Sequence, residues 1–329
     1  MKALLAEKEA TAFSINYIAN LSACVCVYVH AMIAEKLSPR TRLGYVQLRT
    51  PDLSGQLDFY TRLIGLKVHW QEAGRAGLGT GHHDLLRLVE VPDAKHYPKT
   101  TGLYHQAFLL PDRRELARAI ARIASFRYPQ SPTDHMVSGT TYLNDADGNT
   151  VELYVATPGR GTWSSDGQVW IIKTNDGTPH NGREPLNVEA YLDLLSSEED
   201  LHAPLSPDTI TGHVHLYMND LGRGMQFYSD TLGLYEHTIA RKYQMAETIL
   251  PDYDVHFVAF NTWKGATARP APADAVGLDH YSIELYNQVD KARLADRFGR
   301  DGIRVEENTE GMWVNDPAGN SLLIRELIS

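Results

Sequence analysis

An internal repeat is the feature that most constrains the fold of this chain. Residues 44–66 have the sequence GYVQLRTPDLSGQLDFYTRLIGL and residues 212–234 the sequence GHVHLYMNDLGRGMQFYSDTLGL, with nine identical positions at a constant offset of 168. Each copy predicts an alternating strand, a turn at Asp52 or Asp220, and an amphipathic helix that ends near the shared Gly-Leu pair. A repeated unit of this kind predicts two halves with the same architecture.

A second repeated unit completes each half. Residues 102–123 and 277–298 each predict a strand followed by a helix. Each is followed by a turn and a last strand, NDADGNTVELY at 144–154 and NDPAGNSLLIR at 315–325. The sequence therefore predicts four modules of similar plan.

The repeats and the composition between them divide the chain. We predict an N-terminal extension at 1–40, a first two-module domain at 41–158 and a second two-module domain at 209–329. The segment between the domains, 159–208, is rich in Gly, Ser, Asp and Pro. We interpret it as a linker that holds one short helix near 187–197.

Composition excludes several classes of function. A net charge of −10 leaves no basic surface for nucleic acid or an anionic membrane. Two cysteines, Cys24 and Cys26, cannot form a disulfide framework, which favours a reducing, cytoplasmic location. Asn16 and Asn20 interrupt the apolar run at 11–34, so we interpret it as an appended extension, with a targeting segment as the alternative. The 14 histidines are an excess that raises the question of a metal site.

The modules resemble those of a known family. Four βαβββ units, helices that end in FY…LGL, and DADGN or DPAGN turns are similar to the vicinal oxygen chelate superfamily, and within it to the extradiol (meta-cleaving) catechol 2,3-dioxygenases. The segments YHQAFLLPD and FNTWKG resemble the bacterial catechol 2,3-dioxygenase branch in particular. The resemblance covers about 41–329 and implies an α+β fold in which the four βαβββ modules form two half-open barrels.

The resemblance also implies a metal site in the cup between two paired modules, built from the first strand of each module and the last strand of one. The corresponding positions are, in module order, Tyr45, then His105 and Glu152, then His213, then His280 and Leu323. Pairing the second module with the third gives His105, Glu152 and His213, a two-histidine, one-carboxylate set that suits non-haem Fe(II). Glu152 lies between Val151 and Leu153 in an apolar strand, where a buried charge without a partner is costly, and a metal would explain it.

A consecutive pairing of the third and fourth modules is the alternative. It makes His280 the partner ligand of His213, with an irregular third ligand such as Glu326. Side chains alternate between the two faces of a strand, and Glu326 lies three residues after Leu323. Unless a bulge intervenes, its side chain points away from the cup, so strand alternation favours the pairing of modules two and three.

Acid and base groups are the second implication of the resemblance. Tyr142, ten residues before the candidate carboxylate, corresponds to a tyrosine that hydrogen-bonds the bound catecholate, and His135 to a histidine at the cavity mouth. His256 resembles the acid/base histidine of the family and is the candidate proton shuttle. His215 faces the same side of its strand as His213, which makes it a candidate substrate contact. An ordinary core role is the alternative for Tyr142 and His215.

The resemblance and these residues together predict an Fe(II)-dependent extradiol dioxygenase, an oxidoreductase that cleaves a catechol with O2 to a ring-opened semialdehyde. Mn(II) is compatible with the same ligands. The expected partners are a small aromatic diol and O2, without nucleic acid or a membrane, and a homo-oligomer is expected. Two alternatives stay open: a glyoxalase-like metal-dependent isomerase or transferase, and a metal-free ligand-sequestering protein of the bleomycin-resistance type.

Overall fold

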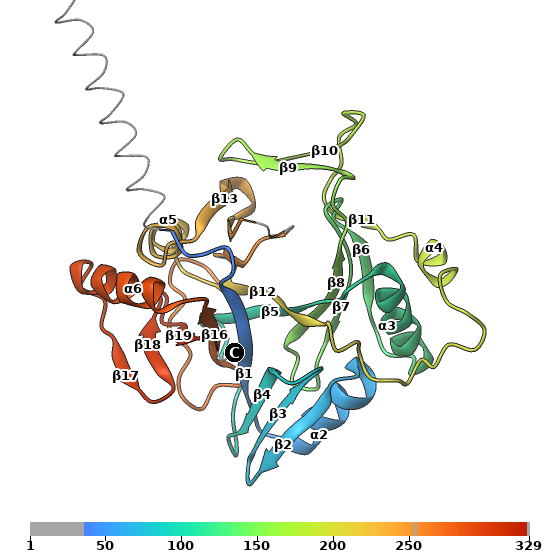
Figure 1. Cartoon of the computed structure of the whole chain (residues 1–329), viewed down its shortest axis with the longest axis horizontal. Coiled ribbons are helices and arrows are strands. Elements are labelled where there is room, and N and C mark those ends of the chain that lie inside the picture. Colours follow the sequence, from blue (N-terminus) through green and yellow to red (C-terminus); the bar gives the residue numbers. More distant parts are fainter. Residues whose placement is uncertain (1–35, 252, 254, 328–329) are drawn as a thin grey trace, which may run out of the picture. The chain divides into compact units, whose positions relative to one another are not determined.

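The computed structural model describes residues 36–251, 253 and 255–327 (Figure 1). The predicted N-terminal extension lies outside the described residues as far as residue 35, and so does its apolar run. Among the helices in the described ranges, none is long and apolar enough to cross a membrane. All of the described helices and strands belong to the unit that begins at Ser38.

One mixed sheet combines the first and the fourth modules. The first module contributes the strands β1 (Arg42–Thr50), β2 (Lys67–Glu72), β3 (Arg75–Gly79) and β4 (Asp84–Glu90). The fourth module contributes the strands β16 (Gly277–Leu285), β17 (Glu306–Asn308), β18 (Gly311–Asn315) and β19 (Ser321–Glu326). The strand order is β17-β18-β19-β16-β1-β4-β3-β2, and the antiparallel pair β1–β16 joins the two modules.

The other mixed sheet combines the second and the third modules. The second module contributes the strands β5 (Gly102–Leu109), β6 (Ser131–Asp134), β7 (Ser138–Asn144) and β8 (Thr150–Ala156). The third module and the linker contribute β12 (Ile210–Tyr217), β13 (Tyr235–Ala240), β14 (Met245–Ile249), β15 (Val258–Asn261) and the short β11 (Glu184–Pro185). The strand order is β11-β6-β7-β8-β5-β12-β15-β14-β13, and the antiparallel pair β5–β12 joins the modules. Each sheet therefore takes one module from each side of the linker, and the predicted α+β fold is confirmed.

Every module has a helix that begins at an Asp or Asn cap. The helices are α2 (Leu53–Asp58), α3 (Arg113–Ser125), α5 (Leu221–Met225) and α6 (Gln288–Arg300), and α2 and α5 continue as the wider turns η1 (Phe59–Ile64) and η2 (Gln226–Thr231). The capping side chains, each of which accepts from a backbone N–H three residues later, belong to Asp52, Asp112, Asp220 and Asn287. These bonds satisfy N–H groups that the first helical turn leaves free. The repeated Asp at the predicted turns is thus explained by helix capping.

The repeated FY and DxxGN motifs contact each other. The hydroxyl of Tyr60, in η1, donates to Asp145 Oδ2 at 3.0 Å, and that of Tyr228, in η2, donates to Asp316 Oδ2 at 2.9 Å. Asp145 Oδ1 also accepts from the backbone N–H of Asn149, which closes the turn that leads into β8. The helical segments of modules one and three are therefore each hydrogen-bonded to the last turn of the following module. In module two, this turn fixes where β8 begins.

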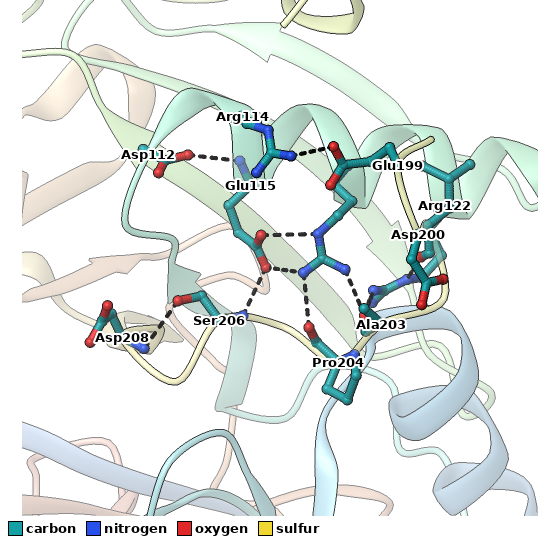
Figure 2. A network of polar contacts seen from close by, with 12 residues as sticks. Asp112, Arg114, Glu115, Arg122, Glu199, Asp200, Ala203, Pro204, Ser206 and Asp208 are labelled. Carbon is teal, nitrogen blue, oxygen red and sulfur yellow. Dashed lines mark hydrogen bonds and ion pairs between the residues drawn. The ribbon is translucent and has the colours of Figure 1, made fainter. Parts of the chain in front are cut away.

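The linker is anchored to α3 at its C-terminal end (Figure 2). Arg122 is fully buried and donates to the carbonyl oxygens of Ile64, Leu201 and Ala203. Burial lowers the pKa of Arg122 to about 10, which leaves the guanidinium charged at neutral pH. Glu115 accepts from the backbone N–H of Ser206 at 2.8 Å. These contacts tie the linker to the second module just before the third module begins.

The first part of the linker is a hairpin of β9 (Gly161–Ser165) and β10 (Trp170–Thr174) (Figure 1). Its turn reaches the third module, where Arg241 Nη1 donates to the Gly167 carbonyl oxygen at 2.9 Å. The indole of Trp170 stacks on the ring of Tyr243 with 4.8 Å between ring centroids. The hairpin thus bridges the two modules that share the larger sheet.

Candidate active site and metal centre

Three central strands of the larger sheet bring the candidate ligands together. His105 lies on β5, which pairs with β8 on one side and with β12 on the other. Glu152 and His213 are both register partners of Ala107, which is two residues after His105. Because alternate residues of a strand, and direct partners on neighbouring strands, point to the same face, all three side chains share one face of the sheet.

The three ligand atoms converge on one point. The Nε2 atoms of His105 and His213 are 3.0 Å apart, and Glu152 Oε2 lies 3.2 Å and 3.0 Å from them respectively. Two ligand atoms that each lie about 2.1 Å from a metal at a right angle are about 3.0 Å apart. The triad therefore fits one face of an octahedral ion and leaves the opposite face open, which is the arrangement of non-haem Fe(II) oxygenases. Among the described residues, this triad is the group of His, Cys, Asp or Glu side chains whose ligand atoms lie close enough together to hold one metal ion.

The protonation states of the triad suit a metal. All three side chains are buried, with Glu152 only 2% exposed. Burial raises the pKa of Glu152, but the charge of His213 and the hydrogen bonds from His105 and His213 outweigh it and hold that pKa well below its usual range. Burial lowers the pKa of His213. At neutral pH Glu152 is thus a carboxylate, and burial favours the neutral form of the His213 imidazole; these are the forms that bind metals.

Tyr142 and His135 form a hydrogen-bonded pair beside the triad. Tyr142, on β7, is the register partner of Glu152 on β8. His135 Nδ1 lies against the carbonyl oxygen of Gly182 and so carries the proton, which leaves His135 Nε2 to accept from the Tyr142 hydroxyl at 2.9 Å. Burial, followed by the charge of Glu152, raises the pKa of Tyr142 well above 10, so this phenol stays a hydrogen-bond donor.

His256 lies on the opposite side of the triad, just before β15. Its ring centroid is 4.1 Å from that of His213, and its Nδ1 is 3.4 Å from Glu247 Oε1. Burial lowers the pKa of His256 well below 6.5, and the neighbouring His213 and His215 imidazoles, which would repel a second positive charge, lower it further. The imidazole is therefore neutral near pH 7 and is able to accept a proton.

His215 is held by an amide. Asn261 Oδ1 accepts from the backbone N–H of Trp263, so its Nδ2 is the group that donates to His215 Nε2 at 2.9 Å. The neutral His215 ring then carries its proton on Nδ1. Its ring centroid is 4.9 Å from that of His105. The structure thus brings His105, His213, His215 and His256 into one cluster.

Comparison with known proteins identifies the family. Residues 42–153 and 210–324 match the model of the Glyoxalase/Bleomycin resistance protein/Dioxygenase superfamily. The chain belongs to this superfamily. It is 34% identical over 288 residues to the catechol-2,3-dioxygenase of Bacillus subtilis (strain 168), a match that covers 86% of this chain and 96% of the relative. It is 28% identical over 141 residues to biphenyl-2,3-diol 1,2-dioxygenase 3 of Rhodococcus globerulus, which covers 40% of this chain and 74% of that protein.

Solved structures of this superfamily share the fold. A Bacillus subtilis protein assigned as a dioxygenase superposes with a TM-score of 0.59 at 11% identity, over 89% of this chain and 87% of that one. Glyoxalase I from Zea mays superposes with a TM-score of 0.53 at 16% identity, over 86% and 92%. The expected resemblance is confirmed, and the chain is a homologue of the extradiol catechol 2,3-dioxygenases with a buried His–His–Glu triad.

At the equivalent positions of the smaller sheet, Tyr45 and His280 contact each other and neighbouring side chains. His280 Nε2 lies 3.1 Å from the Tyr45 hydroxyl and its Nδ1 lies 2.7 Å from Asp279 Oδ2. The ring of Trp313 packs 4.6 Å from that of His280. Because Tyr45 and His280 belong to β1 and β16, they lie on a different sheet from His213. In this superfamily member, one of the two repeated cups therefore contains the triad and the other is packed with side chains.

The triad opens into a cavity of about 530 Å³. Its lining includes groups that the sequence did not single out: Tyr104, Trp163, Trp170, Arg183, Tyr243, Glu247 and Trp263. Trp163, Trp170 and Arg183 come from the linker, whose composition is typical of an exposed connection. Two tryptophans in such a segment were the signal available, since a tryptophan seldom lies in a polar loop without a partner. Glu247 gave no signal, because one acid in an alternating strand is usually solvent-facing.

Proposed function

We propose that the protein is an Fe(II)-dependent extradiol dioxygenase that cleaves a catechol with O2 to a ring-opened semialdehyde. The observation that carries the proposal is the triad, with ligand atoms 3.0–3.2 Å apart and an open face toward the cavity. The relative that matches most of this chain's length is a catechol-2,3-dioxygenase. The Tyr142–His135 pair and His256 add donors and an acceptor that ring cleavage needs.

His105, Glu152 and His213 would hold the metal. Two imidazoles and one carboxylate suit Fe(II), and Mn(II) accepts the same donors. When bound, the ion would supply binding positions for the catechol oxygens and O2 and a path by which electrons pass from the catecholate to O2.

The chain's own residues supply the proton transfers and the orientation. His256 is neutral, and so it can take the proton that leaves a catechol hydroxyl and return it to the leaving oxygen. Tyr142 keeps its proton and lies beside the triad, held by its hydrogen bond to His135. When the substrate binds, the Tyr142 hydroxyl would turn from His135 Nε2 and donate to a catecholate oxygen. His215, next to His105, is placed to contact the substrate.

Oxygen uptake tests the proposal. Purified protein is loaded anaerobically with Fe(II) or Mn(II), mixed with catechol and exposed to air. We expect oxygen consumption, equal amounts of O2 and catechol consumed, and a yellow product. Metal binding without oxygen uptake would favour an isomerase or transferase of the same scaffold, and failure to bind either metal would favour a metal-free binding protein.

Two further expectations stay predictions. The cysteine content favours a cytoplasmic location. A homo-oligomer is predicted, and light scattering of the purified protein would measure its mass.

A further inference from the structure

Glu247 is a buried carboxylate beside the cavity that metal binding does not use. It lies on β14, is 2% exposed and lines the cavity. Among the described Lys and Arg side chains, none forms an ion pair with it. Its polar contacts are the Thr238 hydroxyl, which donates to Oε2 at 2.6 Å, and His256 Nδ1, which is 3.4 Å from Oε1. A buried carboxylate costs free energy unless its contacts compensate for the loss of water. The role of Glu247 therefore follows from these two contacts.

The sheet explains why Thr238 and Glu247 meet. They are register partners on β13 and β14, and the pairing of these strands shifts between Glu236 and Thr238. Such a bulge changes the direction of side chains on one strand and is common next to active sites. Here it gives Oε2 of Glu247 a fixed donor, which leaves Oε1 to face His256.

The contact with Oε1 determines which nitrogen of His256 is free. In its ionised form Glu247 only accepts hydrogen bonds, so above its pKa the facing Nδ1 must carry the proton of the neutral ring. The other nitrogen, Nε2, then has an open lone pair, and it is buried without a hydrogen-bond partner among the described residues. At 3.4 Å the Nδ1 contact is longer than a strong hydrogen bond, as catalytic contacts often are before the substrate binds.

We propose that Glu247, oriented by Thr238, is a positioning residue that holds His256 in the Nδ1–H tautomer, with Nε2 free to take the substrate's proton. This inference rests on the proposed role of His256 and extends it. The same logic operates wherever a buried carboxylate orients a histidine base: the acid does not transfer the proton but sets which nitrogen can receive it. The chemical consequence here is that Glu247 acts on the rate of proton transfer and does not contact the metal or the catechol.

The test compares Glu247→Gln with the unaltered, Fe(II)-loaded protein. The amide oxygen can still accept from Thr238, and its NH2 group then faces His256, which favours the opposite tautomer. We expect kcat to fall about 10- to 100-fold, the range for groups that orient a catalytic residue, while KM stays within about twofold and iron content is unchanged. The matched control is Glu236→Gln, which removes the same charge at an exposed position of β13 and should keep the original kcat.

A second readout does not depend on turnover. In Zn(II)-loaded protein labelled with ¹⁵N-histidine, NMR should show His256 as the Nδ1–H tautomer, with its signal identified by its loss in His256→Ala. Glu247→Gln should shift it toward Nε2–H. An Nε2–H ring in the unaltered protein, or an unchanged kcat in Glu247→Gln, would overturn the inference.

Thr238→Val keeps the test decisive if Glu247→Gln fails to fold. It removes the hydroxyl that orients Glu247 and preserves the shape of the side chain, so a several-fold loss of kcat with normal iron content supports the inference and an unchanged kcat overturns it. Ring cleavage by the unaltered protein is judged separately. If that reaction is absent, the proposed function fails, whereas the tautomer measurement still reports on Glu247.

Discussion

Glu152 carries a negative charge between Val151 and Leu153, both of which are fully buried. Such a charge is tolerated when its partners compensate for the loss of water. Its partners here are the two ligand histidines, 3.0 Å and 3.2 Å away. The buried charge of Glu152 is therefore explained by the ion that the triad would hold. Replacing Glu152 should remove the ion and leave the fold in place.

Glu152→Ala should abolish iron retention while the fold remains, because the variant lacks the carboxylate of the triad but keeps the hydrophobic neighbours that pack the strand. Iron per chain and circular dichroism measure the two effects. The matched control is His280→Ala, which removes the histidine at the repeat-equivalent position of His105 in the other sheet and should keep its iron. Normal iron content in Glu152→Ala would contradict the assignment.

His256→Ala should keep iron and lose turnover by about 100-fold or more, since general acid–base groups contribute about 10² to 10⁴ in rate. Iron content and steady-state oxygen uptake are the measurements. His82→Ala, at an exposed position, serves as the control. An unchanged rate in His256→Ala would remove this residue from the proton transfer.

Glu247 also predicts a pH dependence of stability. Burial raises its pKa from 4.5 to about 7. The folded protein therefore holds this proton more tightly than the unfolded chain, and stability falls as pH rises from about 4.5 to 7. Glu247→Gln does not titrate, so its stability relative to the unaltered protein should rise by about 2 kcal/mol between pH 5 and pH 8. Urea unfolding of both proteins at the two pH values measures the difference, and a pH-independent difference would refute the argument.

At the scale of elements, the β9–β10 hairpin turns a connecting segment into a wall of the active site. Ser165, Gly167 and Trp170 contact the third module, although the hairpin follows the second in sequence. Aromatic side chains placed this way contribute contact area to a bound ring. The linker therefore lines the cavity, and we expect it to limit the size of the substituent that the cavity admits.

Trp170→Ala should raise KM for catechol substrates by about 2- to 10-fold, because an aromatic contact is worth about 0.5–1.5 kcal/mol. Iron content and kcat should change little, since the hairpin lies apart from the triad strands. Ile171→Ala is the control, because Ile171 is exposed on the same strand and does not line the cavity. Equal KM values in the two variants would show that the hairpin does not contact the substrate.

At the scale of the whole molecule, the triad joins the two sides of the linker. His105 and Glu152 come from the second module, His213 from the third, and the strands that carry them meet in the β8-β5-β12 centre of one sheet. An ion bound there links segments more than 100 residues apart, as the 108-residue separation of the two histidines shows. Metal binding should therefore stabilise the assembled sheet.

Removal of the metal with a chelator should lower Tm, because a ligand that binds only the folded chain adds about 3 kcal/mol at a hundredfold excess over its Kd. Calorimetry of the Fe(II)-loaded and stripped protein measures the shift. Glu152→Ala should show no shift, whereas His280→Ala should show the full one. A shift of the same size in Glu152→Ala would place the stabilising metal elsewhere.

The local pattern of the sequence was sufficient for the modules, their capped helices and the fold class, because turn chemistry, strand alternation and helix capping depend on residues a few positions apart. The repeat also indicated which positions could carry ligands. Only the tertiary structure decided which modules pair with each other. The joining pairs β5–β12 and β1–β16 form through backbone groups that every strand possesses, so the sequence does not specify them. The same holds for the linker wall and for Glu247: their roles arise from contacts between strands and loops far apart in the chain, and no local pattern records which distant side chain a residue will meet.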